Sequence, residues 1–175
     1  MNRLLRSSLR LLDRLSPPEA VHAHCDIPCG IYDPHLAQIG ALTCIRMNQL
    51  INDLAAPGGA GAPPSKEERD KYVNSLSRYI ATKEEHAELV KKEVRIIWGD
   101  YFKPEHLEKH ADLHATVFNI MKLGSKVRQN VDLKAAEELL AAVQKFAEIF
   151  WATKDAKTQR VPSRMPAGGE LVLPA

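Results

Sequence analysis

Apolar residues recur at helical spacing through most of the chain. They return every three to five positions within residues 36–54, 72–98, 107–121 and 136–150. Steps of this size place apolar side chains on one face of an α-helix. No segment shows the sustained alternation of apolar and polar residues that is typical of a half-buried strand. The pattern therefore predicts an all-α protein.

Start and stop signals bound the first two predicted helices. Asp33 and Pro34 open the first helix, because Asp can cap its free N–H groups and Pro suits its first turn. The Gly- and Pro-rich stretch 55–64 ends this helix and is expected to be a flexible loop. The Ser65–Glu68 capping box opens the second helix, and Gly99 ends it.

Two further helices complete the predicted fold. Pro104 opens the third and Asp132 caps the fourth. With short connections, residues 34–156 are expected to form an up-and-down four-helix bundle. Residues 157–175 contain prolines and paired glycines without periodicity, and we expect a flexible C-terminal tail there.

Charge is unevenly distributed over the 175 residues, whose formal net charge is +2. Residues 1–23 hold four arginines and two acidic residues, so the rest of the chain is formally neutral. A neutral body has no field suited to nucleic acid, which excludes that class of partner. No apolar stretch approaches the roughly 18 residues that a membrane-spanning helix needs, so a membrane protein is also excluded.

Residues 1–23 form a separable leader in this interpretation. Leucines and arginines alternate in an amphipathic pattern that Pro17 and Pro18 interrupt. An export signal needs an uninterrupted apolar core, and this segment has charged residues at Arg10, Asp13 and Arg14. The sequence therefore argues against an export signal. The composition also resembles an organelle transit peptide, and an ordinary N-terminal helix of the domain is the alternative. We predict a cytoplasmic protein, with organelle targeting by the Arg-rich leader as the other option.

The chemistry is concentrated directly after the leader. His24, Cys25, Asp26 and Cys29 fall within six residues, ahead of the first predicted helix. Between and beside the cysteines, Pro28 stiffens the turn and Gly30 permits a positive φ. A C-x3-C pair by itself is equally typical of a buried pair or a disulfide. Structural zinc would need four nitrogen or sulfur side-chain ligands, and only three such side chains are nearby.

A chain that began at His24 would offer more donors. Its α-amino group, the deprotonated amide of Cys25 and the thiolates of Cys25 and Cys29 would form an N2S2 plane, with the His24 imidazole in axial reach. Such tetragonal sites favour Ni(II) or Cu(II). Since thiolates tend to reduce Cu(II), nickel fits better. The argument requires a free amine, so it also predicts that residues 1–23 are removed.

The same residues resemble a known family. The pattern H-C-x-x-P-C-G-x-Y, fitted by His24 through Tyr32, is similar to the nickel hook of nickel superoxide dismutases. The stretch Trp98–Pro104 resembles a second motif of that family, and Phe150-Trp151 with Lys154 resembles its final helix. The likeness covers about residues 24–155.

The resemblance implies a superoxide dismutase precursor. Superoxide would be converted to O2 and H2O2 by Ni(II)/Ni(III) cycling, with one nickel ion per subunit. The subunits would form a homohexamer, and a leader-processing protease would act before nickel insertion. Carried over to this sequence, the metal ligands are His24, Cys25 and Cys29. Asp26 and Tyr32 orient the hook and its waters and are the candidate catalytic residues, with Tyr32 either a member of the proton path or a buttress of the hook. The supporting residues are Pro28, Gly30, Tyr101 and Lys103.

Two positions depart from the family pattern. Where the best-known members have a Glu on the first helix, this chain has Gly40, and where they have an Arg on the second helix it has His86. Because outer-shell partners orient metal ligands, what holds the His24 ring here is an open question.

Other readings of the motifs predict different proteins. A non-catalytic helical metal-delivery or interaction protein could use the C-x3-C pair without turnover. His106, His110 and His114 share one face of the third predicted helix, a spacing that can bind metal. Cys44, alone on the first helix, is expected to be an inert core residue.

Overall fold

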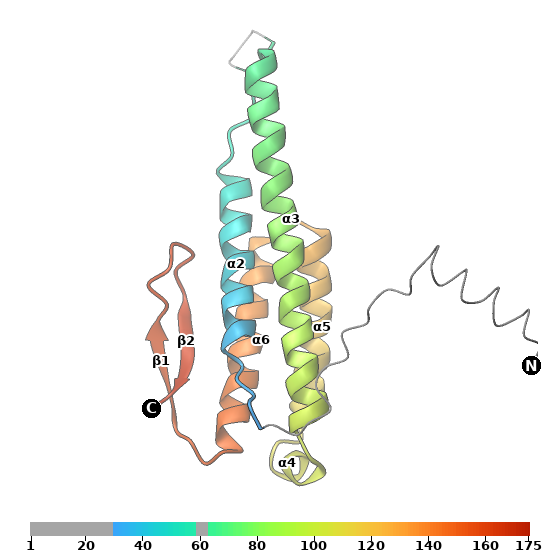
Figure 1. Cartoon of the computed structure of the whole chain (residues 1–175), viewed down its shortest axis with the longest axis vertical. Coiled ribbons are helices and arrows are strands. Elements are labelled where there is room, and N and C mark those ends of the chain that lie inside the picture. Colours follow the sequence, from blue (N-terminus) through green and yellow to red (C-terminus); the bar gives the residue numbers. More distant parts are fainter. Residues whose placement is uncertain (1–29, 59–62) are drawn as a thin grey trace, which may run out of the picture.

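Four long helices run up and down along a common axis in the computed structural model (Figure 1). The structure describes residues 30–58 and 63–175. The bundle helices are α2 (His35–Asn52), α3 (Lys66–Ile96), α5 (Leu113–Gln129) and α6 (Leu133–Ala152). α2 packs on α3 and α6, and α5 packs on the same two helices. This arrangement confirms the predicted four-helix bundle.

Side-chain caps fix where these helices begin. Glu68 N–H donates to Ser65 Oγ and Ser65 N–H donates to Glu68 Oε2, which completes the predicted capping box of α3. Asp132 Oδ1 accepts from Ala135 N at 2.9 Å, as expected for α6. At the start of α2, Asp33 Oδ1 accepts from the backbone N–H of His35 at 2.7 Å.

The core lies between the four helices and is apolar and tightly closed. Its largest fully buried apolar side chains include Phe146 and Phe150 of α6 and Leu42 of α2. A methyl group added to Gly40 would lie 2.9 Å from Val90 Cγ2, so glycine allows α2 and α3 to approach closely. Three residues of the predicted apolar pattern are exposed instead: Leu36 by 54%, Val73 by 61% and Trp98 by 38%.

The third predicted helix is in fact two helices. A short π-helix, η1 (Ile97–Tyr101), continues α3, and α4 (Pro104–Lys109) then ends at His110, whose backbone leaves the helical region (φ −131°, ψ 65°). α5 begins three residues later. His106, His110 and His114 therefore do not share one continuous helical face, which corrects the sequence prediction.

The expectation of a flexible tail is also wrong. The strands β1 (Thr158–Pro162) and β2 (Glu170–Pro174) pair antiparallel, with Arg160 opposite Val172. Figure 1 shows this hairpin alongside the bundle, where it contacts α2 and α6. Val172 is fully buried. The hairpin forms because helix side chains bind its backbone, a tertiary effect that local periodicity does not capture.

Over the described ranges, no helix has the length and apolar character needed to cross a membrane.

Candidate metal centre

Tyr32 and Tyr101 meet at the end of the bundle where α2 begins. Their ring centroids lie 5.7 Å apart, with the planes inclined by 53°. Tyr101 is the last residue of η1, whose wider turn is closed by Phe102 N–H donating to Ile97 O at 3.3 Å. Such single π-turns are frequent at functional sites. The π-turn thus sets the position of the ring against which Tyr32 packs.

Residues of α4 and α6 hold Tyr101 in place. Its hydroxyl lies 2.8 Å from Thr153 Oγ1, and the Thr153 hydroxyl donates to Phe150 O at 2.6 Å. Since that donation uses the only hydrogen of the Thr153 hydroxyl, Tyr101 is the donor to Thr153. The Tyr101 ring also stacks on His106, with centroids 5.6 Å apart and planes 21° apart. The sequence gives no signal for Thr153, and it suggested His106 as a possible metal ligand rather than as a support for Tyr101.

A cation lies over the same aromatic cluster. Lys154 Nζ is 4.7 Å from the ring centroid of Phe150, 5.4 Å from that of Tyr101 and 5.7 Å from that of Trp151. Within the described part of the chain, Lys154 has no carboxylate partner. Among the described residues its positive charge is therefore held beside Tyr101 by the faces of the three rings alone.

The predicted site residues divide between described and undescribed positions. His24, Cys25, Asp26, Pro28 and Cys29 lie outside the described residues. Gly30 has φ +70°, the left-handed conformation that the sequence predicted for it. Tyr32 and Tyr101 come together, whereas Lys103 is exposed, with its backbone N–H donating to His106 Nδ1 at 3.1 Å.

No metal cluster forms elsewhere in the described chain. Among residues 30–58 and 63–175, no three His, Cys, Asp or Glu residues lie together as metal ligands would. His106 Nδ1 is used by Lys103, and His114 Nδ1 accepts from Trp98 Nε1 at 2.9 Å. These histidines of α4 and α5 are therefore engaged in structural hydrogen bonds.

Cys44 is not available as a thiolate ligand. It is fully buried, and its Sγ donates to Lys83 O at 3.6 Å. Burial raises the pKa of the Cys44 thiol to about 12, with the nearby Lys83 charge a smaller opposing influence. This confirms the inert core role predicted for Cys44.

The remaining donors fit nickel. Residues 59–62 are glycines and alanines, so they contribute no side-chain ligand. The thiols that are left as candidate ligands are those of Cys25 and Cys29, which follow His24 in the sequence. Two thiolates with nitrogen donors suit a tetragonal nickel site.

The two positions that depart from the family pattern are neighbours. A methyl group placed on Gly40 would lie 3.2 Å from His86 O, so the two residues face each other across the α2–α3 contact. His86 Nδ1 lies 2.9 Å from Thr82 O. Because a carbonyl only accepts, Nδ1 carries the hydrogen, and Nε2 of the neutral ring is left as an acceptor. A side chain as large as Glu does not fit at position 40 at this helix spacing.

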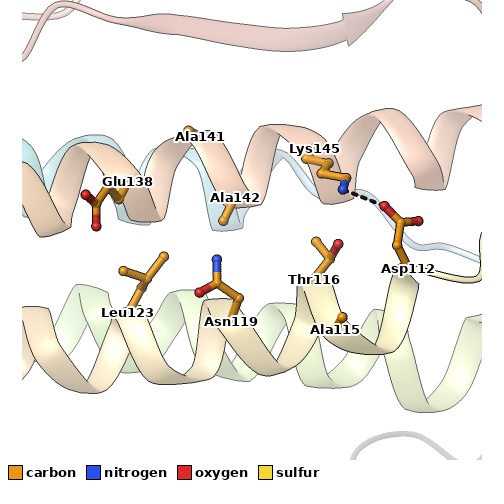
Figure 2. Close-up of a pocket in the computed structure, with 9 residues that line it drawn as sticks. All are labelled: Asp112, Ala115, Thr116, Asn119, Leu123, Glu138, Ala141, Ala142 and Lys145. Atoms are coloured by element: carbon orange, nitrogen blue, oxygen red, sulfur yellow. Dashed lines mark ion pairs between the residues drawn. The ribbon is translucent and has the colours of Figure 1, made fainter.

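A groove of about 550 Å³ between α5 and α6 is unrelated to this centre (Figure 2). Its walls carry small residues, and its charged residues are Asp112, Glu138 and Lys145. The carboxylate of Asp112 is paired with the Lys145 ammonium at 2.5 Å. With neither cysteine nor histidine in its lining, the groove offers no soft metal ligand.

The described fold is a four-helix bundle, and the candidate metal ligands of the sequence lie ahead of its first helix. The family model for nickel-containing superoxide dismutase matches residues 19–154. The chain belongs to this family: it is a superoxide dismutase, and nickel is its cofactor.

Relatives and solved structures agree with this assignment. The nickel superoxide dismutase of Streptomyces coelicolor is 34% identical over 149 residues, which covers 83% of this chain and all of the relative. That of Streptomyces seoulensis is 33% identical with the same coverage. A native nickel superoxide dismutase structure has a TM-score of 0.60 at 33% identity, covering 75% of this chain and 99% of that one. An apo structure has a TM-score of 0.61 at 30% identity, covering 73% of this chain and all of that one.

Proposed function

We propose that residues 24–29 form the nickel site of this enzyme. His24 supplies its α-amino nitrogen and its imidazole, Cys25 its amide nitrogen and thiolate, and Cys29 the second thiolate. The observation that carries this proposal is the donor inventory. Cys44 is a buried thiol with a raised pKa, and the described residues contain no alternative metal cluster.

Chain connectivity ties this segment to the aromatic cluster. Tyr32 is the third residue after Cys29, and three residues of chain span at most about 11 Å. The second thiolate is therefore close to Tyr32, which packs on Tyr101. Pro28 and Gly30 shape the turn that carries the ligands.

Bound nickel supplies one-electron chemistry, since two thiolates and an amidate bring the Ni(III) state within reach. Disproportionation takes an electron from one superoxide and gives it to a second, which leaves as H2O2 with two protons. Tyr32 and Asp26 hold and pass these protons near the ligands. The positive charge of Lys154, which lies over the Tyr101 ring, attracts the superoxide anion. Lys103, two residues after Tyr101 in the sequence, adds a second positive charge.

The leader keeps the precursor inactive in this proposal. While Ala23 precedes His24, the His24 nitrogen is a peptide amide, and it cannot serve as an amine ligand. A leader-processing protease that cuts after Ala23 creates the amine. The test loads Ni(II) into three proteins: full length, one beginning at His24 and one beginning at Ala23.

Only the protein that begins at His24 is expected to bind nickel tightly, to accelerate superoxide decay and to give a Ni(III) electron-resonance signal. Equal activity in the full-length and trimmed proteins would overturn the role of the His24 amine. Mass spectrometry of the N-terminus in cytoplasmic and organelle fractions tests where processing occurs, and we propose the cytoplasm.

Assembly into a homohexamer completes the proposal. Phe118 is 67% exposed and Trp98 38% exposed, which is large aromatic surface for a lone subunit. The formally neutral body does not oppose association. Light scattering at micromolar concentration is expected to give six times the subunit mass, and a stable monomer would refute it.

A further inference from the structure

The β1–β2 hairpin is bound by a glutamine of the helix that follows the metal segment. Gln38 Nε2 donates to Val172 O at 3.0 Å, and Val172 N–H donates to Gln38 Oε1 at 2.7 Å. Both residues are fully buried. The side-chain amide thus pairs with β2 as a neighbouring strand would. It satisfies the buried backbone N–H and carbonyl of Val172 at the outer edge of β2.

Further contacts bind the hairpin along its length. Gln49 Nε2 donates to Ala167 O at 3.2 Å, and Gln144 Nε2 donates to Glu170 O at 2.8 Å. At the turn, Gly169 has φ +76°, and an added methyl group would lie 3.1 Å from Leu42 and 3.2 Å from Leu140. Polar side chains on both α2 and α6 bind the hairpin backbone, and the turn at Gly169 lies close to both helices. These contacts indicate a surface shaped to fit the hairpin.

The first turn of α2 meets the hairpin through Gln38. In the same turn the backbone N–H of His35 donates to Asp33 Oδ1, and Leu36 is 54% exposed. Gln38 lies in the same turn, six residues after Tyr32. The match to the family model ends at residue 154, ahead of β1. The hairpin is therefore an addition to the part of the chain that the family model covers.

We infer that the β1–β2 hairpin is a positioning element for the metal centre. By holding Gln38, it keeps the first turns of α2 folded against the bundle. Those turns fix the direction in which the chain at Tyr32 leaves the helix. The inference rests on the proposed placement of nickel at residues 24–29.

Two altered proteins, both beginning at His24, test the inference. Gln38→Met removes both hydrogen bonds to Val172 and keeps the side-chain length, and a second protein ends at Lys157. Gln129→Met, at an exposed position of α5, is the matched control. Lys83→Met, which weakens the far end of α5, is the control for a general loss of stability. The measurements are amide hydrogen exchange and the rate of Ni(II) loss to a chelator.

For Gln38→Met we expect exchange of the amides of residues 35–42 to rise about tenfold, while the amides of α5 keep their protection. Nickel loss should accelerate severalfold in both hairpin variants and stay unchanged in Gln129→Met. If the shortened protein fails to fold, Gln38→Met decides the result.

Unchanged exchange and nickel loss in Gln38→Met would overturn the inference. So would equal acceleration of nickel loss in Lys83→Met, since that would mean that only overall stability matters. Failure of the proposed nickel site at residues 24–29 would be recognised separately. In that case the otherwise unaltered protein beginning at His24 would bind no nickel, or its Cys29→Ser variant would still bind nickel.

Discussion

Tyr101 donates its phenolic hydrogen to Thr153, at 2.8 Å, across the junction between η1 and the end of α6. Thr153 in turn donates to Phe150 O. This short chain of hydrogen bonds fixes the ring on which Tyr32 packs. The neighbours of Tyr32 are therefore set by two elements distant from it in sequence.

Removing the Tyr101 hydroxyl should lower the stability of the fold only a little, whereas removing the whole ring should lower it strongly. Tyr101→Phe is expected to lower the free energy of unfolding by about 1 kcal/mol, because one hydrogen bond is lost. Tyr101→Ala should lower it by about 3 kcal/mol and reduce dismutase activity, because Tyr32 loses its packing partner. Urea unfolding and superoxide decay measure the two effects. Equal stability of both variants would show that the ring contributes nothing.

The cysteines should differ sharply in their effects. Cys25→Ser or Cys29→Ser is expected to abolish nickel binding and activity while circular dichroism stays helical, because both residues precede the bundle. Cys44→Ser should keep activity and lose only modest stability, because it changes a buried contact with Lys83 O. Full turnover in Cys29→Ser would refute the two-thiolate site.

Lys83 is expected to be a strong determinant of stability. Its buried ammonium donates to the carbonyls of Val127, Arg128 and Asn130, where α5 ends. Lys83→Met should lower the free energy of unfolding by about 2 kcal/mol, because those carbonyls lose their donor. The control is Lys92→Met, at an exposed position of α3, the helix that also carries Lys83. This variant should change the free energy of unfolding little. Thermal unfolding that ranks the two alike would contradict this role.

Acid should remove part of the stability contributed by Asp132. Its carboxylate accepts from Lys126 Nζ and from Ala135 N, and these bonds hold its pKa below the usual value. A carboxyl whose pKa is lower in the folded protein than in the unfolded chain stabilises the fold at pH values above its unfolded-state pKa of about 4. This stabilisation is lost as the pH falls through the pKa of the folded state.

Asp132→Asn should therefore unfold at a lower temperature than the unaltered protein at pH 7. The difference should shrink below about pH 4, as the wild-type carboxyl becomes protonated in both states. Asp100→Asn, at an exposed position of η1, is the control. A difference that stays constant with pH would show that the cap acts without its charge.

Helix signals in the sequence were reliable where they are local. The Ser65–Glu68 box and the Asp132 cap are properties of a few adjacent residues, and both are present in the structure. The split after α4 was missed because His110 carries no proline or glycine signal, although Asp112 before α5 was an available hint.

The β1–β2 hairpin could not be predicted from neighbouring residues in the sequence. Gly168 and Gly169 mark its turn, yet neither strand alternates clearly, and its docking depends on Gln38, 134 residues before Val172. For the metal centre, the sequence supplied the candidate ligands and Tyr32. The structure adds the support of Tyr101 by Thr153 and His106, which arises only when η1, α4 and the C-terminal end of α6 come together in the fold.

The distance in sequence between Gln38 and Val172 also has a consequence in time. A ribosome adds about 5–20 residues per second, so the strand that Gln38 binds is synthesised roughly 7 to 27 seconds after it. During that interval α2 can form, but its amide must be satisfied by water. The helix that follows the proposed metal ligands is thus the first described element to be made and among the last to complete its contacts. Nickel loading in the cell should accordingly lag behind synthesis of the ligands themselves.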